Sequence, residues 1–306
     1  MNDKIALKTY LVKKSSILLL CASFVFLFLF LRARIWYLLD SDMSSEMILA
    51  KQLNEERAIF AKGWYYATEL RLLYMPQVFR ILFLFSDYWH FVRVYSTIII
   101  HAMLLGSALC LSKRLDLGWR KAVLGMAVLT PVSMVYGEYV LVCPYYVPCI
   151  AISFFAMAMV LHLTAEPGNH VRAILTAASA ALAFASSLIG PRQIVMFYFP
   201  AMMAAGLIAL SDLIKKKKTL KKAFFDPAFS ICLTNMFSAG IAYLINLFVL
   251  PDMYYFVHWT QIRLTGFNVR RFLNALAGLV NMLGFRRESG IAGIITDACV
   301  LAVTAG

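Results

Sequence analysis

Long apolar stretches separated by short charged connections are the main pattern of this chain. The first uncharged stretch runs from Ile17 to Leu31, and several comparable stretches follow it. About 20 apolar residues in a helix match the thickness of a membrane's hydrocarbon layer. The pattern predicts an all-α, polytopic transmembrane helical bundle. We expect its spans at roughly 15–36, 92–111, 121–139, 147–164, 172–189, 194–213 and 228–250, with a last span from about 290.

The composition excludes an ordinary soluble protein. Of the 306 residues, 62% are hydrophobic and only 15% are charged, whereas soluble domains have roughly 45–50% and 25%. The net charge is +13, and in a multi-spanning chain such an excess is typical of cytoplasmic loops that lie against anionic lipid headgroups. No basic stretch is interleaved with stacking aromatic residues, so we expect membrane lipids as partners and no nucleic acid.

Basic residues occur in every second connection between the predicted spans. They are Lys113, Arg114, Arg120 and Lys121, then His170 and Arg172, then the six lysines from Lys215 to Lys222. Because cytoplasmic loops are enriched in Lys and Arg, the alternation predicts a multi-pass cell-membrane protein with a cytoplasmic N-terminus. The first apolar stretch reaches Arg32 and Arg34 without a small-x-small cleavage site, so we expect it to stay as a transmembrane helix.

The connections on the other, extracytoplasmic side carry different chemistry. The longest, over residues 37–91, is acidic; the others are the short break at 190–192 and the segment from Pro251 onward. These three segments are the candidate functional face. The chain stops at Gly306 inside an apolar stretch, so we expect a C-terminally truncated protein.

An acidic cluster opens the long connection. Met43, Met47, Ala50 and Leu53 recur at helical intervals, which predicts an amphipathic surface helix with Asp42 at its N-terminus. Two interpretations remain open. Acidic residues in a first turn cap free N–H groups and complement the helix dipole. However, Asp42 and Glu46 repel each other on one helical face, with Asp40 just before them. Such acidic clusters often bind a cation, hold a hydroxyl substrate or shift the pKa of a functional carboxyl group.

The cluster also carries a resemblance to a known family. An apolar first helix, the Asp-x-Asp motif of Asp40 and Asp42, and Ala50 eight residues after Asp42 resemble the GT-C superfamily of polyprenyl-phosphate-sugar-dependent glycosyltransferases. The wider string, residues 40–46 followed by 64–70, is similar to uncharacterised bacterial members of that group. The resemblance implies a membrane catalytic module of about seven transmembrane helices over residues 1–250, with 37–91 as its first outer loop. Residues 251–306 would then be an outer loop and the start of a further, truncated transmembrane region.

The resemblance implies a reaction and a set of residues. A sugar would move from a polyprenyl-phosphate donor to a cell-envelope glycan or lipid acceptor on the extracytoplasmic face. The family's general base matches Asp42, with Asp40 a close second. Met43 follows Asp42 where the family's other form has an acid, so the second acidic role falls to Asp40 or Glu46. A divalent metal stays an open alternative, and no other cofactor is implied.

The transfer of a sugar from a lipid phosphate to a hydroxyl requires the same kinds of group. A carboxylate must accept the proton of the acceptor hydroxyl, and a cation must hold the departing phosphate. Arg192, after Gly190 and Pro191, is the best-placed cation because its planar fork binds phosphate oxygens bidentately. A snorkelling interfacial arginine is the alternative. Weaker candidates follow in the next outer segment: Arg263, Arg270, Arg271, Arg286 and Arg287.

Other candidates would line the substrate site. Trp64, Tyr65 and Tyr66 could stack on a sugar or belong to the aromatic belt of the membrane interface. Glu69 and Glu138 could add to the acidic pocket, and His258 could serve as a second acid/base, a metal ligand or an ordinary interfacial residue.

Two other classes compete with a transferase. A transporter or flippase of lipid-linked material would carry ionisable residues near the midplane of its spans. Here the acids gather at one membrane surface, which favours the transferase. The third alternative is an inactive membrane fragment.

Overall fold

The computed structural model describes residues 2–66, 69–131, 133–165, 169–215, 219, 222, 226–256 and 268–282. The predicted span from about 290 and the candidate His258 lie outside these residues. Within them the chain is mostly helical, with one pair of two-residue strands.

Six helical stretches are long and apolar enough to cross a membrane within the described residues: Lys13–Arg34, Trp89–Arg114, Val147–Thr164, His170–Leu188, Ile194–Ile214 and Pro227–Asp252. They belong to α1 (Asn2–Arg34), α4 (Trp89–Arg114), α7 (Val147–Thr164), α8 (Asn169–Leu188), η2 with α9 (Ile194–Tyr198, Phe199–Ile214) and α11 (Pro227–Phe248). Six of the seven spans predicted before residue 250 are confirmed as apolar helices of spanning length.

The remaining prediction, one continuous helix over 121–139, is wrong. The chain forms α5 (Arg120–Leu129), then the short α6 (Met134–Tyr136) and the π-helix η1 (Gly137–Val142). Thr130 has φ −106° and ψ 132°. Because the ring of Pro131 clashes with a helical backbone at the preceding residue, the helix ends there.

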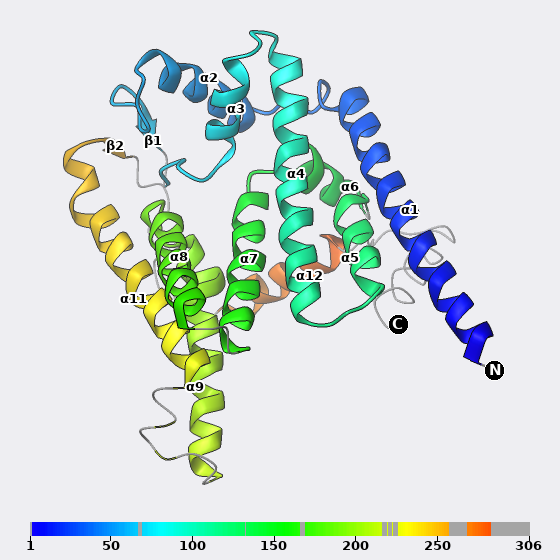
Figure 1. Cartoon of the computed structure of the whole chain (residues 1–306). Helices are drawn as coiled ribbons and strands as arrows, with labels where there is room; N and C mark the ends of the chain where they lie inside the picture. The colour runs from blue at the N-terminus through cyan, green and yellow to red at the C-terminus, as the bar shows by residue number, and fades with distance from the viewer. Residues whose placement is uncertain are drawn as a thin grey trace.

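The helices pack in two groups that meet at α7 (Figure 1). In one group α4 lies against α7, and α5 lies against both α1 and α4. In the other group α11 lies against both α8 and α9, and α7 contacts α8 and α11. A further helix, α12 (Val269–Met282), contacts α6.

A separate layer covers one end of the bundle (Figure 1). It contains α2 (Ser41–Glu55), α3 (Met75–Phe83), β1 (Tyr65–Tyr66), the 3₁₀ turn η3 (Leu250–Asp252) and β2 (Tyr255–Phe256). Tyr65 pairs with Tyr255 in parallel register, and Arg192 Nε donates to Glu69 Oε1 at 2.7 Å. The three segments expected to share a functional face therefore do meet.

Helix α2 has the apolar face that the sequence predicts. Met43, Met47, Ala50 and Leu53 are all buried. Met43 and Met47 belong to one hydrophobic cluster, which also contains residues from the C-terminal half of α1, from α4 and from η1. Glu46 is buried on this face as well, which the hydrophobic pattern does not predict.

The arrangement of the connections gives a test of orientation. Glu55 is exposed on α2, and Lys215 is exposed at the opposite end of the bundle. We expect a membrane-impermeant maleimide to label Glu55→Cys in intact cells and Lys215→Cys only after permeabilisation. The unmodified chain, with its native cysteines, is the control. Labelling of Lys215→Cys alone in intact cells would reverse the predicted topology.

Candidate functional site

Asp40 and Asp42 have different positions at the start of α2. Asp40 is the N-cap residue, and its Oδ1 accepts hydrogen bonds from the Met43 N–H at 2.7 Å and from the Tyr145 hydroxyl at 2.6 Å. Asp42 lies in the first turn and is exposed. Burial and the hydrogen bond to Asp40 raise the pKa of Tyr145 far above its usual range, so this phenol stays a donor. The capping role therefore falls to Asp40, and Asp42 faces solvent.

Glu46 is the buried member of the acidic cluster. Its side chain is 4% exposed, and Arg71 Nη1 lies 3.2 Å from its Oε1. This contact is an ion pair without hydrogen-bond geometry, and within the described residues neither Glu46 oxygen accepts a hydrogen bond. Burial raises the pKa of Glu46 to about 7; Arg71 opposes this change, while Asp42 and Asp40 add to it. Glu46 can therefore gain or lose a proton near neutral pH.

A second buried acid, Glu69, forms a tighter pair. Arg192 Nε donates to Glu69 Oε1 at 2.7 Å, and the Tyr74 hydroxyl donates to Oε2 at 3.1 Å. The Arg192 guanidinium also lies 4.4 Å from the centre of the Tyr146 ring. Burial by itself would lower the pKa of Arg192, but the hydrogen bond and charge of Glu69 outweigh it and raise that pKa.

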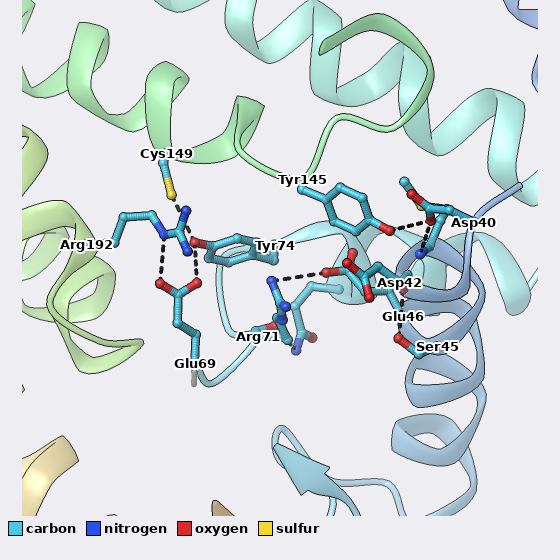
Figure 2. Close-up of polar contacts among 12 residues, drawn as sticks. Asp40, Asp42, Ser45, Glu46, Glu69, Arg71, Tyr74, Tyr145, Cys149 and Arg192 are labelled. Atoms are coloured by element: carbon cyan, nitrogen blue, oxygen red, sulfur yellow. Dashed lines mark hydrogen bonds and ion pairs between the residues drawn. The ribbon is translucent and has the colours of Figure 1, made fainter. Parts of the chain in front are cut away.

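Tyr74 connects the two ion pairs (Figure 2). Its hydroxyl reaches Glu69 and also lies 3.0 Å from Cys149 Sγ, while the Arg71 guanidinium lies 5.2 Å from the centre of its ring. The site is thus a row of alternating charges, Glu46, Arg71, Glu69 and Arg192, arranged around one aromatic ring.

Arg93, on α4, fixes the chain where it leaves α1 and turns into α2. The side chain is buried, and it donates to the carbonyls of Ile35 and, at 2.8 Å, Leu38. Cys143 Sγ lies 3.7 Å from Arg93 Nη2 and donates to the Leu38 carbonyl at 3.4 Å. These contacts set the position of Asp40, two residues further on.

An apolar groove of about 530 Å³ reaches this site. Tyr74 lines it, together with side chains of α3, α4 and α7 that include Val78, Ile100, Met103, Ala151, Ile152 and Phe155. Along α4 the lining continues from Ile100 to Cys110, roughly 15 Å of helix. The groove therefore runs from the charged site into the apolar part of the bundle.

No family model, curated protein or solved structure matches this chain. The interpretation of the site consequently depends on its own geometry and chemistry.

The structure brings some of the predicted residues together. Asp40, Asp42 and Glu46 share the start of α2, and Glu69 and Arg192 meet beside Tyr74. Arg192 is paired with Glu69 and is therefore not an isolated cation.

Trp64, Tyr65 and Tyr66, at and just before β1, pack against other side chains. The Tyr66 hydroxyl is buried and accepts the Ala61 N–H at 2.8 Å, and Tyr65 stacks on Tyr255 with ring centres 5.3 Å apart. Trp64 packs against the cluster that contains Tyr66 and Leu250. These side chains attach β1 to the 250–256 segment, and none of these contacts involves the acidic cluster.

Glu138 lies elsewhere. It lines a separate cavity of about 480 Å³ near the C-terminal end of α1, together with Arg34 and Tyr37. Among the described residues, no three His, Cys, Asp or Glu side chains converge closely enough to hold a metal ion. The divalent metal stays a prediction without geometric support in this part of the chain.

Several residues of the site are absent from the sequence-based candidates, among them Arg71, Tyr74, Arg93 and Tyr145. The sequence does carry a signal for Arg71, because this basic residue follows Glu69 closely in the same acidic connection. Tyr145 lies in the polar break before α7, and no local pattern connects it to Asp40.

The raised pKa of Glu46 predicts a pH-dependent stability. The folded state holds a proton on Glu46 up to about pH 7, whereas the unfolded chain releases it near 4.5. Between these values the folded state binds more protons, so its free energy of unfolding falls as pH rises, by about 3 kcal/mol. We expect this fall in urea unfolding in detergent, and its loss in Glu46→Gln.

The matched control is Glu55→Gln, an exposed position on the same helix. It should keep the pH dependence of the unmodified chain. Equal dependence in the unmodified chain and in Glu46→Gln would show that Glu46 titrates normally.

Proposed function

We propose that this chain is an integral membrane glycosyltransferase of the GT-C type, acting on the extracytoplasmic face of a cell membrane. It would move a sugar from a polyprenyl-phosphate donor to a cell-envelope glycan or lipid acceptor. The observation that supports this proposal most directly is the apolar groove of about 530 Å³ that is lined in part by Tyr74, the residue that contacts both Glu69 and Arg71.

The groove and the charged site suit the two halves of the donor. A polyprenyl chain is apolar and gains about 0.8 kcal/mol for each CH₂ group removed from water, so the groove between α4 and α7 fits it. The phosphate needs a cation, since a phosphoryl group near hydrocarbon is costly unless it is paired. Arg71 and Arg192 are both next to Tyr74, where the groove meets the charged site.

The transfer step needs a proton acceptor. The acceptor oxygen forms a bond to the anomeric carbon of the sugar, and the bond between that carbon and the phosphate oxygen breaks. The electron pair of the broken bond stays on the phosphate, and the hydroxyl proton goes to a carboxylate. Asp42 fits by its exposure, and Glu46 fits by its pKa of about 7, because a general base works best near the operating pH. Asp40 is already engaged as cap and acceptor of Tyr145.

A flippase of lipid-linked material is the second candidate, and one observation favours it. His101 is buried near the middle of α4, where its two ring nitrogens contact the carbonyls of Thr97 and Val140. Ionisable residues at membrane depth often mark transport pathways. The two functions differ in one measurable respect, since a flippase moves the donor without breaking the bond between sugar and phosphate. An inactive fragment would do neither.

Substitution of the carboxylates tests the transferase. In a transfer assay with a polyprenyl-phosphate sugar, Asp42→Asn or Glu46→Gln should lower turnover by about 100-fold or more, because each removes a proton acceptor and keeps the side-chain shape. Asp40→Asn should keep most of the cap and cost less. Glu55→Gln is the control on the same helix. Full transfer in Asp42→Asn and Glu46→Gln but not in Asp40→Asn would move the base to Asp40, and full transfer in all three variants would eliminate this cluster as the source of the base.

A further inference from the structure

We propose that Arg71 is the cation that receives the donor phosphate, and that it does so by leaving Glu46. This exchange of partners rests on the glycosyltransferase function proposed above.

The two ion pairs of the site differ in how firmly they are held. Glu69 accepts a 2.7 Å hydrogen bond from Arg192 and another from the Tyr74 hydroxyl. Glu46 accepts no hydrogen bond on either oxygen within the described residues, and its contact with Arg71 is 3.2 Å long. Charge-assisted hydrogen bonds contribute more than an ion pair lacking that geometry. The Glu46–Arg71 pair is therefore the one that a phosphate opens more easily.

Arg71 also has the better position. It directly precedes Leu72, Leu73 and Tyr74, which line the groove, and its guanidinium lies over the Tyr74 ring. A phosphate at the end of a chain lying in this groove emerges beside Tyr74. About a quarter of the Arg71 side chain is exposed, so the guanidinium can turn toward this phosphate without unpacking a helix.

The exchange changes the properties of Glu46. In the unliganded site Arg71 supplies the positive charge that opposes protonation of this buried carboxylate. Once the phosphate takes Arg71, Glu46 binds a proton more strongly, while Asp42 and Asp40 remain beside it. The hydroxyl proton then moves to Asp42, the exposed carboxylate of the cluster, as the bond from the acceptor oxygen to the anomeric carbon forms. The electron pair of the broken bond goes to the phosphate, where Arg71 stabilises it.

Competition for the arginine gives a sharp test. Glu46 and the phosphate compete for Arg71, so Glu46→Gln should tighten binding of a polyprenyl monophosphate by at least about fivefold at pH 8. Arg71→Gln should weaken it by about tenfold or more, and Arg71→Lys should weaken it less, since it keeps the charge and loses the fork. Binding is measured on the full chain in detergent. A polyprenyl alcohol, which lacks the phosphate, measures the contribution of the apolar chain alone.

The second ion pair provides the matched controls. Glu69→Gln releases Arg192 just as Glu46→Gln releases Arg71, and Arg192→Gln is the counterpart of Arg71→Gln. If Glu69→Gln tightens binding and Glu46→Gln does not, or if Arg192→Gln weakens it and Arg71→Gln does not, Arg192 holds the phosphate and the exchange is wrong. The glutamine variants of the two arginines still decide the question if a glutamate variant fails to fold.

If the proposed glycosyltransferase function is wrong, the binding experiment gives a different result. In that case the unmodified chain would bind the polyprenyl monophosphate no better than the alcohol. Equal binding of the monophosphate by all the variants, combined with clear preference over the alcohol in the unmodified chain, would overturn the exchange and leave the proposed donor intact.

Discussion

The free-energy cost of burying charge next to hydrocarbon determines how the outer layer is built. An unpaired buried charge is strongly destabilising, so each buried acid of the layer needs a donor or a cation nearby. Glu46 has Arg71, and Glu69 has Arg192 and Tyr74. The partly buried Asp40 accepts a hydrogen bond from Tyr145. Tyr145 and Arg192 come from breaks between spans. The layer that contains α2 and α3 therefore packs on the end of the bundle through charged contacts as well as through apolar packing.

The sequence predicts the spans well because their length and polarity are dictated by the membrane alone. The exception is 121–139, where hydropathy continues across Pro131 but the backbone cannot stay helical. The face of α2 is likewise predictable from its periodicity, since Met43, Met47, Ala50 and Leu53 are all buried. The local pattern could not show that Glu46 shares this face.

The candidate site was harder to predict because its partners are distant in sequence. The sequence predicts Asp40 as a site residue, but the Tyr145 hydroxyl that donates to it comes from the break before α7. For the aromatic residues at β1, sugar stacking and an interfacial belt were the two expectations. Neither expectation includes the contacts of Tyr65 and Tyr66 that join β1 to the 250–256 segment. Such pairings depend on topology, and local hydrophobic pattern carries no information about them.

The division of the chain into two layers also explains why the charged site lies where it does. Spans α4 and α7 supply an apolar groove but no carboxylate along it, because an ionised group at that depth would lack water. The outer layer supplies the acids, and Tyr74 belongs to both parts, since it lines the groove and donates to Glu69. A substrate with an apolar chain and a charged head can satisfy both layers at once. A wholly polar molecule would leave the groove unused, and a wholly apolar one would leave the arginines with only their carboxylates.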